Sequence, residues 1–338
     1  MLRKLTYPVI SALFLTLALA GCQREPVPAD GDVIRFSVNS VDVAQAPTKT
    51  DPPIPTPETI GSPDNPLSVN GCKVIVWGSL TEDSENWKPV FDNHPSIEIE
   101  NENNTWTYDE DTYGKKYWNR EASYKFRAAY PIAAVDGSSD VNSLTATYQG
   151  NAQDLMIAST TLAGEGAKTV ELKFMHTCSA VRVYMVDVRG AQTSARYKIT
   201  NFGLQNLYMD GTLTVNWNTV AVNWNTSGST RTDGYSWTPS TGSTGWDVPA
   251  TYTAFTDWLF FIPQALNPDT EKPCINLTFT AGNQTISYIK NLEDLNTTSW
   301  EAGMMYTYFI IVRPKEIEMT VEWTEWGENV NTEYTPIG

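Results

Sequence analysis

Apolar and polar residues alternate one by one in several segments of this chain. In the segment IEMTVEW (317–323), every odd position is apolar and every even position is polar. A period of two places successive side chains on opposite faces of a β-strand. No segment sustains the 3.6-residue period of a helix, and only KNLEDLNTTSW (290–300) suggests a helical turn. We therefore expect an all-β protein that buries its apolar faces between sheets.

The other strand-like segments are rich in β-branched and aromatic residues and are separated by clusters of Gly, Asn, Asp and Pro. They are CKVIVWG (72–78), YKFRAAYP (124–131), VELKFMHTCSAVRVYMV (170–186), GTLTVNW (211–217), WLFFIP (258–263), CINLTFTA (274–281) and MYTYFIIV (305–312). At 338 residues the chain is long enough for two cores. Many short strands and few helices favour two tandem antiparallel β-sandwiches.

The segment 170–186 changes the parity of its apolar positions. Even positions share one face up to Cys178, whereas odd positions are apolar after Ala180. Such a switch indicates either a bulge or a strand that passes from one sheet to another. The loop AGEGAK (163–168) precedes it, so we place the domain boundary near residue 165: one sandwich over 33–165 and the other over 166–338.

The N-terminus is typical of an exported lipoprotein. A positive start, MLRK, is followed by an uncharged apolar run that ends in LALAGC (17–22), the pattern of a signal peptide. LALAGC resembles the lipobox of bacterial lipoproteins, which predicts a signal peptide over 1–21, a lipid on Cys22 and a polar stem over 22–32. Two acyl chains make a stable membrane anchor.

The charge balance restricts the partners. Removing residues 1–21 takes away Arg3 and Lys4 and no acidic residue, which changes the formal net charge from −16 to −18. A polyphosphate partner is repelled by such a chain, so nucleic-acid binding is not expected.

Catalytic and metal-binding motifs are missing from the sequence. It has two histidines, His94 and His176, and no HExxH, CxxC or G-x-S-x-G. His176 lies on an apolar strand face and is interpreted as a core histidine. DEDTYG (109–114) lacks the full ligand set of a calcium loop and is interpreted as a solvated acidic turn. We expect no enzyme activity, no cofactor and no metal. The alternative of a hydrolase needs a pair of catalytic carboxylates, and the sequence does not identify one because their separation is spatial rather than sequential. Whether any of Cys72, Cys178 and Cys274 pair is left open.

The twelve tryptophans provide an alternative function, since indole rings stack on sugars. Trp323 alternates with other apolar residues and is expected in the core. Six others have polar neighbours and are expected at the surface: Trp106, Trp118, Trp217, Trp224, Trp237 and Trp246. The alternative hypothesis is therefore a glycan-binding surface lipoprotein.

A well-patterned strand stands alone near the start of the mature chain. In IRFSVNS, the apolar residues Ile34, Phe36 and Val38 alternate with polar ones. A proline-rich linker over 47–66 follows, and proline excludes it from the interior of a sheet or helix.

The motifs resemble those of the fimbrillin family, the lipoprotein-derived pilins of type V pili in anaerobic diderm bacteria. In order, they are the lipobox, IRFSVNS with TKT, KVIVWG, YW with YKFRAAYP, DLMIA, VELKFMHTCSAVRV, FIPQAL, WEAGMMYTYFIIV and IEMTVEW. The resemblance implies two transthyretin-like sandwiches. It also implies a lipidated outer-membrane precursor that a trypsin-like protease cuts, removing the first strand so that a strand of the next subunit takes its place in a surface fimbrium.

On this basis Ile34, Phe36 and Val38 form the core of a removable strand. Of the basic residues Arg24, Arg35 and Lys49, we expect cleavage after Lys49, because only that cut releases the strand from an exposed linker. The implied partners are other pilus subunits, the maturation protease and a host or glycan ligand. The donor is left open: it is the tail 327–338, IEMTVEW, or no segment at all if the chain is a tip subunit.

Overall fold

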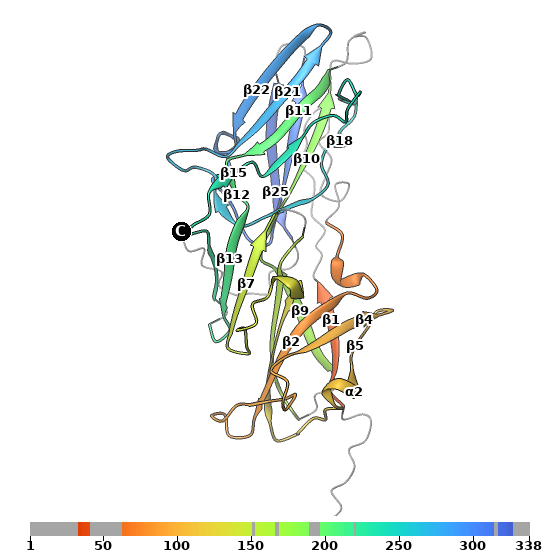
Figure 1. Ribbon diagram of the computed structural model, residues 1–338, viewed down its shortest axis with the longest axis vertical. Helices are drawn as coiled ribbons and strands as arrows, with labels where there is room; N and C mark the ends of the chain where they lie inside the picture. Colours follow the sequence, from red (N-terminus) through yellow and green to blue (C-terminus); the bar gives the residue numbers. More distant parts are fainter. Residues whose placement is uncertain are drawn as a thin grey trace, which may run out of the picture.

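The computed structural model describes residues 33–40, 63–150, 153–165, 169–188, 197–219, 221–313 and 317–326. The molecule is elongated, with the N-terminal strands at one end and the C-terminal strands at the other (Figure 1). The described helices are short: α2 (Glu110–Tyr113), η2 (Pro66–Ser68), η3 (Ile132–Ala134) and η4 (Leu292–Leu295). The all-β class predicted from the two-residue period is therefore confirmed, and η4 falls in the one segment that suggested a helical turn.

The N-terminal half is an eight-stranded sheet that closes on itself. Its order is β3-β2-β4-β5-β1-β9-β8-β6, and β2 also pairs with β6. The strands are β1 (Arg35–Ser40), β2 (Lys73–Thr81), β3 (Lys88–Pro89), β4 (Ile97–Glu102), β5 (Thr105–Tyr108), β6 (Ser123–Tyr130), β8 (Met156–Ala163) and β9 (Thr169–His176). Alternation explains its core: Val74 and Val76 of β2 and Ile97 and Ile99 of β4 are buried, while residues between them reach the other face.

The C-terminal half is a sandwich of two sheets. One contains β10 (Ser179–Asp187), β18 (Thr253–Ala254), β19 (Leu259–Phe261), β24 (Met304–Val312) and β25 (Ile317–Glu325). The other contains β11 (Lys198–Gln205), β16 (Tyr235–Trp237), β17 (Trp246–Asp247), β21 (Cys274–Ala281) and β22 (Gln284–Asn291). Val181, Val183 and Met185 of β10 point into the core between them. Most pairs are antiparallel, but β10 runs parallel to β24, as β1 does to β9.

A third core joins the two halves. β7 (Ser143–Gln149), from the N-terminal half of the sequence, pairs with β13 (Asp210–Asn216), which also pairs with β14 (Ala221–Asn225). Two short pairs complete the strands: β12 (Leu207–Tyr208) with β15 (Arg231–Thr232), and β20 (Gln264–Ala265) with β23 (Ser299–Trp300). Trp77 and Trp217, from opposite halves, belong to one buried cluster at this junction.

The parity switch marks the passage of the chain from one sheet to the other. β9 pairs with β1 and β8 in the N-terminal sheet, whereas β10 begins the C-terminal sandwich. The change of sheet thus lies after the boundary expected near residue 165. Close to the expected boundary, a Cβ on Gly164 would lie 2.0 Å from the Asn119 carbonyl oxygen. This glycine permits a close backbone approach within the sheet.

The tryptophan expectations are largely reversed. Trp106, Trp118 and Trp217 are buried, and Trp224, Trp237 and Trp246 are half-buried. Trp323, which was expected in the core, is 51% exposed. A period of two fixes the face of the strand on which a residue lies, but not whether a neighbouring sheet covers that position. The tryptophan pattern therefore gives no support to a sugar-binding surface formed by the six predicted residues.

The three cysteines of the described chain, Cys72, Cys178 and Cys274, are free thiols. Burial raises the pKa of all three, that of Cys72 to about 11. At pH 8 about one Cys72 thiol in a thousand is then ionised, and the thiolate is the reactive species.

We expect a Cys22→Ser variant to react very slowly with Ellman's reagent when folded and to release three equivalents of thionitrobenzoate when unfolded in guanidinium. Rapid reaction of the folded protein would contradict this burial.

Candidate functional site: the seat of the first strand

β1 lies between β5 and β9 and pairs with both strands (Figure 1). We call this position between β5 and β9 the seat of β1. It runs parallel to β9 over Arg35–Ser40 and is antiparallel to β5, where Phe36 lies opposite Trp106. Just before the strand, the Ile34 amide donates a hydrogen bond to the Lys116 carbonyl at 2.9 Å. Without β1, the facing edges of β5 and β9 have no pairing partner among the described strands.

The apolar row of β1 points into the N-terminal core. Ile34 is 1% exposed and Phe36 is 6% exposed, while Val38 is half-buried and packs against the same cluster. Arg35 and Asn39 lie on the exposed face. Burial of each apolar side chain contributes about 1.5–3 kcal/mol. The row is therefore the main apolar contribution of β1 to its seat.

Phe36 occupies an aromatic socket formed by strands distant in sequence. Its ring makes edge-to-face contacts with Phe126 at 5.7 Å and with Tyr108 at 6.2 Å. Phe126 in turn contacts Trp118, and Phe91 contacts Tyr108. Such pairs contribute about 0.5–1.5 kcal/mol beyond simple burial. The socket therefore favours a flat ring at this position of any strand that occupies the seat.

Tyr108 is held in place by a hydrogen bond at its hydroxyl. Its hydroxyl accepts a hydrogen bond from the Lys116 amide at 3.2 Å, and burial raises the pKa of the phenol. Because Lys116 also binds Ile34 through its carbonyl, the segment around it positions both the entrance of β1 and the wall of the socket.

The predicted site residues divide into two groups. Ile34, Phe36 and Val38 come together in the seat, whereas Cys22 and Lys49 lie outside the described residues, as does most of the linker 47–66. Arg35, the alternative cleavage position inside the strand, is paired opposite Thr169 of β9. The sequence analysis missed the socket residues, although the alternating segment TWTY of β5 carries a strand signal.

The remaining candidates for chemistry have structural explanations. His176 is a core histidine: its side chain is 6% exposed and its Nδ1 lies 2.6 Å from Asp154 Oδ2. In the acidic turn, the Asp109 carboxylate caps α2 by accepting from the Asp111 and Thr112 amides, and hydrogen bonds to Thr112 and Asp111 lower its pKa. No group of three or more metal-ligating side chains occurs within the described ranges. Nor do these ranges contain a helix with the length and hydropathy needed to cross a bilayer.

The fold of this chain is similar to folds of known proteins. One is a fimbrial protein from Bacteroides vulgatus ATCC 8482, with 15% sequence identity, a TM-score of 0.53 and an alignment that covers 87% of this chain and 99% of that chain. The fold is also similar to that of a candidate cell adhesion protein from Bacteroides ovatus ATCC 8483 (15% identity, 87% and 97%, TM-score 0.51). At these identities the likeness shows the fold alone. No curated protein matches the chain.

A family model described as fimbrillin-like matches residues 68–326, which is most of the sequence. The match includes the strands that form the socket and the whole described C-terminal sandwich. On this match, the chain belongs to the fimbrillin-like family.

Proposed function

We propose that this protein is a structural, non-enzymatic subunit of a surface fimbria that supports adhesion. Its precursor is exported as an outer-membrane lipoprotein anchored through Cys22. Cleavage after Lys49 releases the lipid together with β1, and a strand from a neighbouring subunit takes the vacated seat. The observation that carries this proposal is that, among the described strands, β1 alone closes the N-terminal sheet between β5 and β9.

The geometry of the seat supports the exchange step. β1 is paired with β9 along its length rather than exposed to solvent, and its inward row fills a core built by other strands. Its loss leaves two unpaired edges and an open aromatic socket. Such edges accept an added strand, with backbone hydrogen bonds providing affinity and side-chain pockets providing selectivity. A precursor that keeps its own β1 in place protects these edges from aggregation during export.

The C-terminal sheet narrows the choice of donor segment. β25 pairs with β24 from Met304 opposite Glu325 to Val312 opposite Ile317, and Met319 of β25 is buried. Donation of IEMTVEW would break this pairing and expose the core beneath it. We infer that β25 stays in its sheet and that any donor segment of this chain lies within residues 327–338.

The cleavage step is tested by sequencing the N-terminus of fibres purified from the cell surface. For the natural protein we expect the mature chain to begin at Thr50. A Lys49→Gln variant should keep β1 and its lipid, because a trypsin-like protease no longer finds a basic residue in the linker. It should accumulate in the membrane fraction and leave the fibre fraction.

An Arg24→Gln variant is the matched control and should mature and assemble normally. Fibres that begin at Glu25, or fibre subunits that all carry a lipid on Cys22, would contradict removal of β1.

A further inference from the structure

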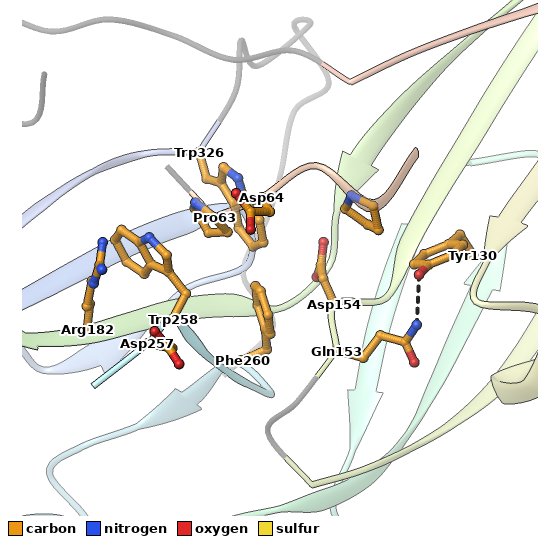
Figure 2. Close-up of a pocket in the computed structure, with 11 residues that line it drawn as sticks. Pro63, Asp64, Tyr130, Gln153, Asp154, Arg182, Asp257, Trp258, Phe260 and Trp326 are labelled. Atoms are coloured by element: carbon orange, nitrogen blue, oxygen red, sulfur yellow. Dashed lines mark hydrogen bonds between the residues drawn. The ribbon is translucent and has the colours of Figure 1, made fainter. Parts of the chain in front are cut away.

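A pocket lies where the two halves of the molecule meet (Figure 2). Its walls come from the segment leading into η2, the end of β6, the residues just before β8, β10, the segment around β19 and the residue that follows β25. Its volume is about 520 Å³, within the range of roughly 300–1,000 Å³ common for ligand sites. The fimbrial function proposed above does not use this pocket.

One wall of the pocket is aromatic and includes Trp258, Phe260 and Trp326 (Figure 2). Trp326 is stacked with Phe260 at 5.4 Å and with His176 at 3.5 Å, so its ring is held in place. The guanidinium of Arg182 lies over Trp258 at 5.5 Å from the ring centre. These contacts fix the aromatic wall before any ligand arrives, which lowers the entropic cost of binding.

The remaining lining groups are mainly hydrogen-bond acceptors. Asp64 and Asp257 contribute exposed carboxylates, and Gln153 donates its amide N–H to the Tyr130 hydroxyl at 2.8 Å, which leaves its carbonyl oxygen as an acceptor. Asp154 is 3% exposed and is drawn with its carboxylate toward the pocket (Figure 2). Its Oδ2 lies 2.6 Å from His176 Nδ1. Its Oδ1 is buried, and the Leu155 backbone and the Cys178 thiol also interact with this carboxylate.

Arg182 is the one cationic side chain among the described lining residues, and it already has several partners. It donates to the Thr256 carbonyl at 3.3 Å and stacks over Tyr184 as well as Trp258. The two exposed carboxylates, Asp64 and Asp257, therefore outnumber one engaged guanidinium among the described lining residues, and an anionic ligand meets net repulsion. The accessible oxygens of Asp64, Asp257 and Gln153 favour a ligand that donates hydrogen bonds.

A sugar ring combines the required properties. Its C–H face packs on aromatic rings, and its hydroxyls donate to carboxylate and amide oxygens. We propose that this pocket binds a neutral or amino-sugar pyranose unit of a glycan. The site differs from the six tryptophans suggested by the sequence, because it is formed by residues that only the fold brings together.

Saturation-transfer NMR with the purified protein that lacks the signal peptide, residues 1–21, tests the proposal. The probes are cellotriose, a glucosamine trimer, a galacturonic acid trimer and oligolysine, followed by a glycan array of neutral, amino and acidic sugars. We expect saturable binding of a neutral or amino-sugar probe and no binding of the acidic trimer. Trp258→Ala and Gln153→Ala should each weaken binding at least tenfold.

Matched substitutions outside the pocket, Trp87→Ala and Gln284→Ala, should leave binding unchanged, with thermal melts to verify that every variant is folded. Gln153 is exposed, so its substitution tests the site even if Trp258→Ala fails to fold. Four results would each overturn the proposal: binding of oligolysine alone, a preference for acidic sugars, an equal loss of sugar binding in the control variants, or no sugar binding across the array. Fibre assembly is not a readout in this experiment, so its outcome is separate from that of strand exchange.

Discussion

Replacement of Phe36 by alanine is expected to lower the free energy of unfolding of the N-terminal half by about 3–5 kcal/mol. The side chain is 6% exposed and makes edge-to-face contacts with Phe126 and Tyr108, both of which lose a partner. Since these rings are held by other strands, the cavity can collapse only in part. Urea denaturation followed by near-ultraviolet circular dichroism measures the change.

Ser37→Ala is the control, because this neighbouring position belongs to the opposite face of β1. It should change the free energy of unfolding by less than about 0.5 kcal/mol. After cleavage of the linker at Lys49, β1 should leave the Phe36→Ala protein faster than the Ser37→Ala protein, as measured by mass spectrometry under native conditions. Equal stability and equal release in the two variants would show that the socket does not hold the strand.

Replacement of Trp217 by alanine is expected to have an effect of similar size, about 3–5 kcal/mol, at the junction of the two halves. Trp217 is 1% exposed and belongs to the cluster that also contains Trp77 and Ile262. The guanidinium of Arg127 lies 5.8 Å from its ring centre. Because this core draws residues from both halves, its loss should uncouple them, and calorimetry should show two unfolding transitions in place of one.

Trp323→Ala removes the same side chain from an exposed position of β25 and should change stability by less than about 0.5 kcal/mol. If Trp217→Ala still unfolds in a single transition with little loss of stability, the third core does not couple the halves.

The local features of this protein were readable from the sequence. The two-residue period identified most of the long strands, including β25 and the inward row Ile34 and Phe36, because alternation reflects one strand and its two faces. The parity switch after Cys178 indicated a change of sheet or a bulge, and the structure shows the change of sheet. The lipobox and the basic residue of the linker are also local signals, so Cys22 and Lys49 were predicted from sequence and stay predictions.

The tertiary structure alone determined which strands are neighbours. Nothing in IRFSVNS indicates that it runs parallel to β9 or that Phe36 meets Phe126 and Tyr108. For the same reason Trp323 was wrongly expected in the core, and the pocket beside Asp154 had no sequence signal. Alternation depends on the geometry of one chain segment, whereas pairing, burial and cavities depend on contacts between segments far apart in sequence. Only the folded chain brings those segments together.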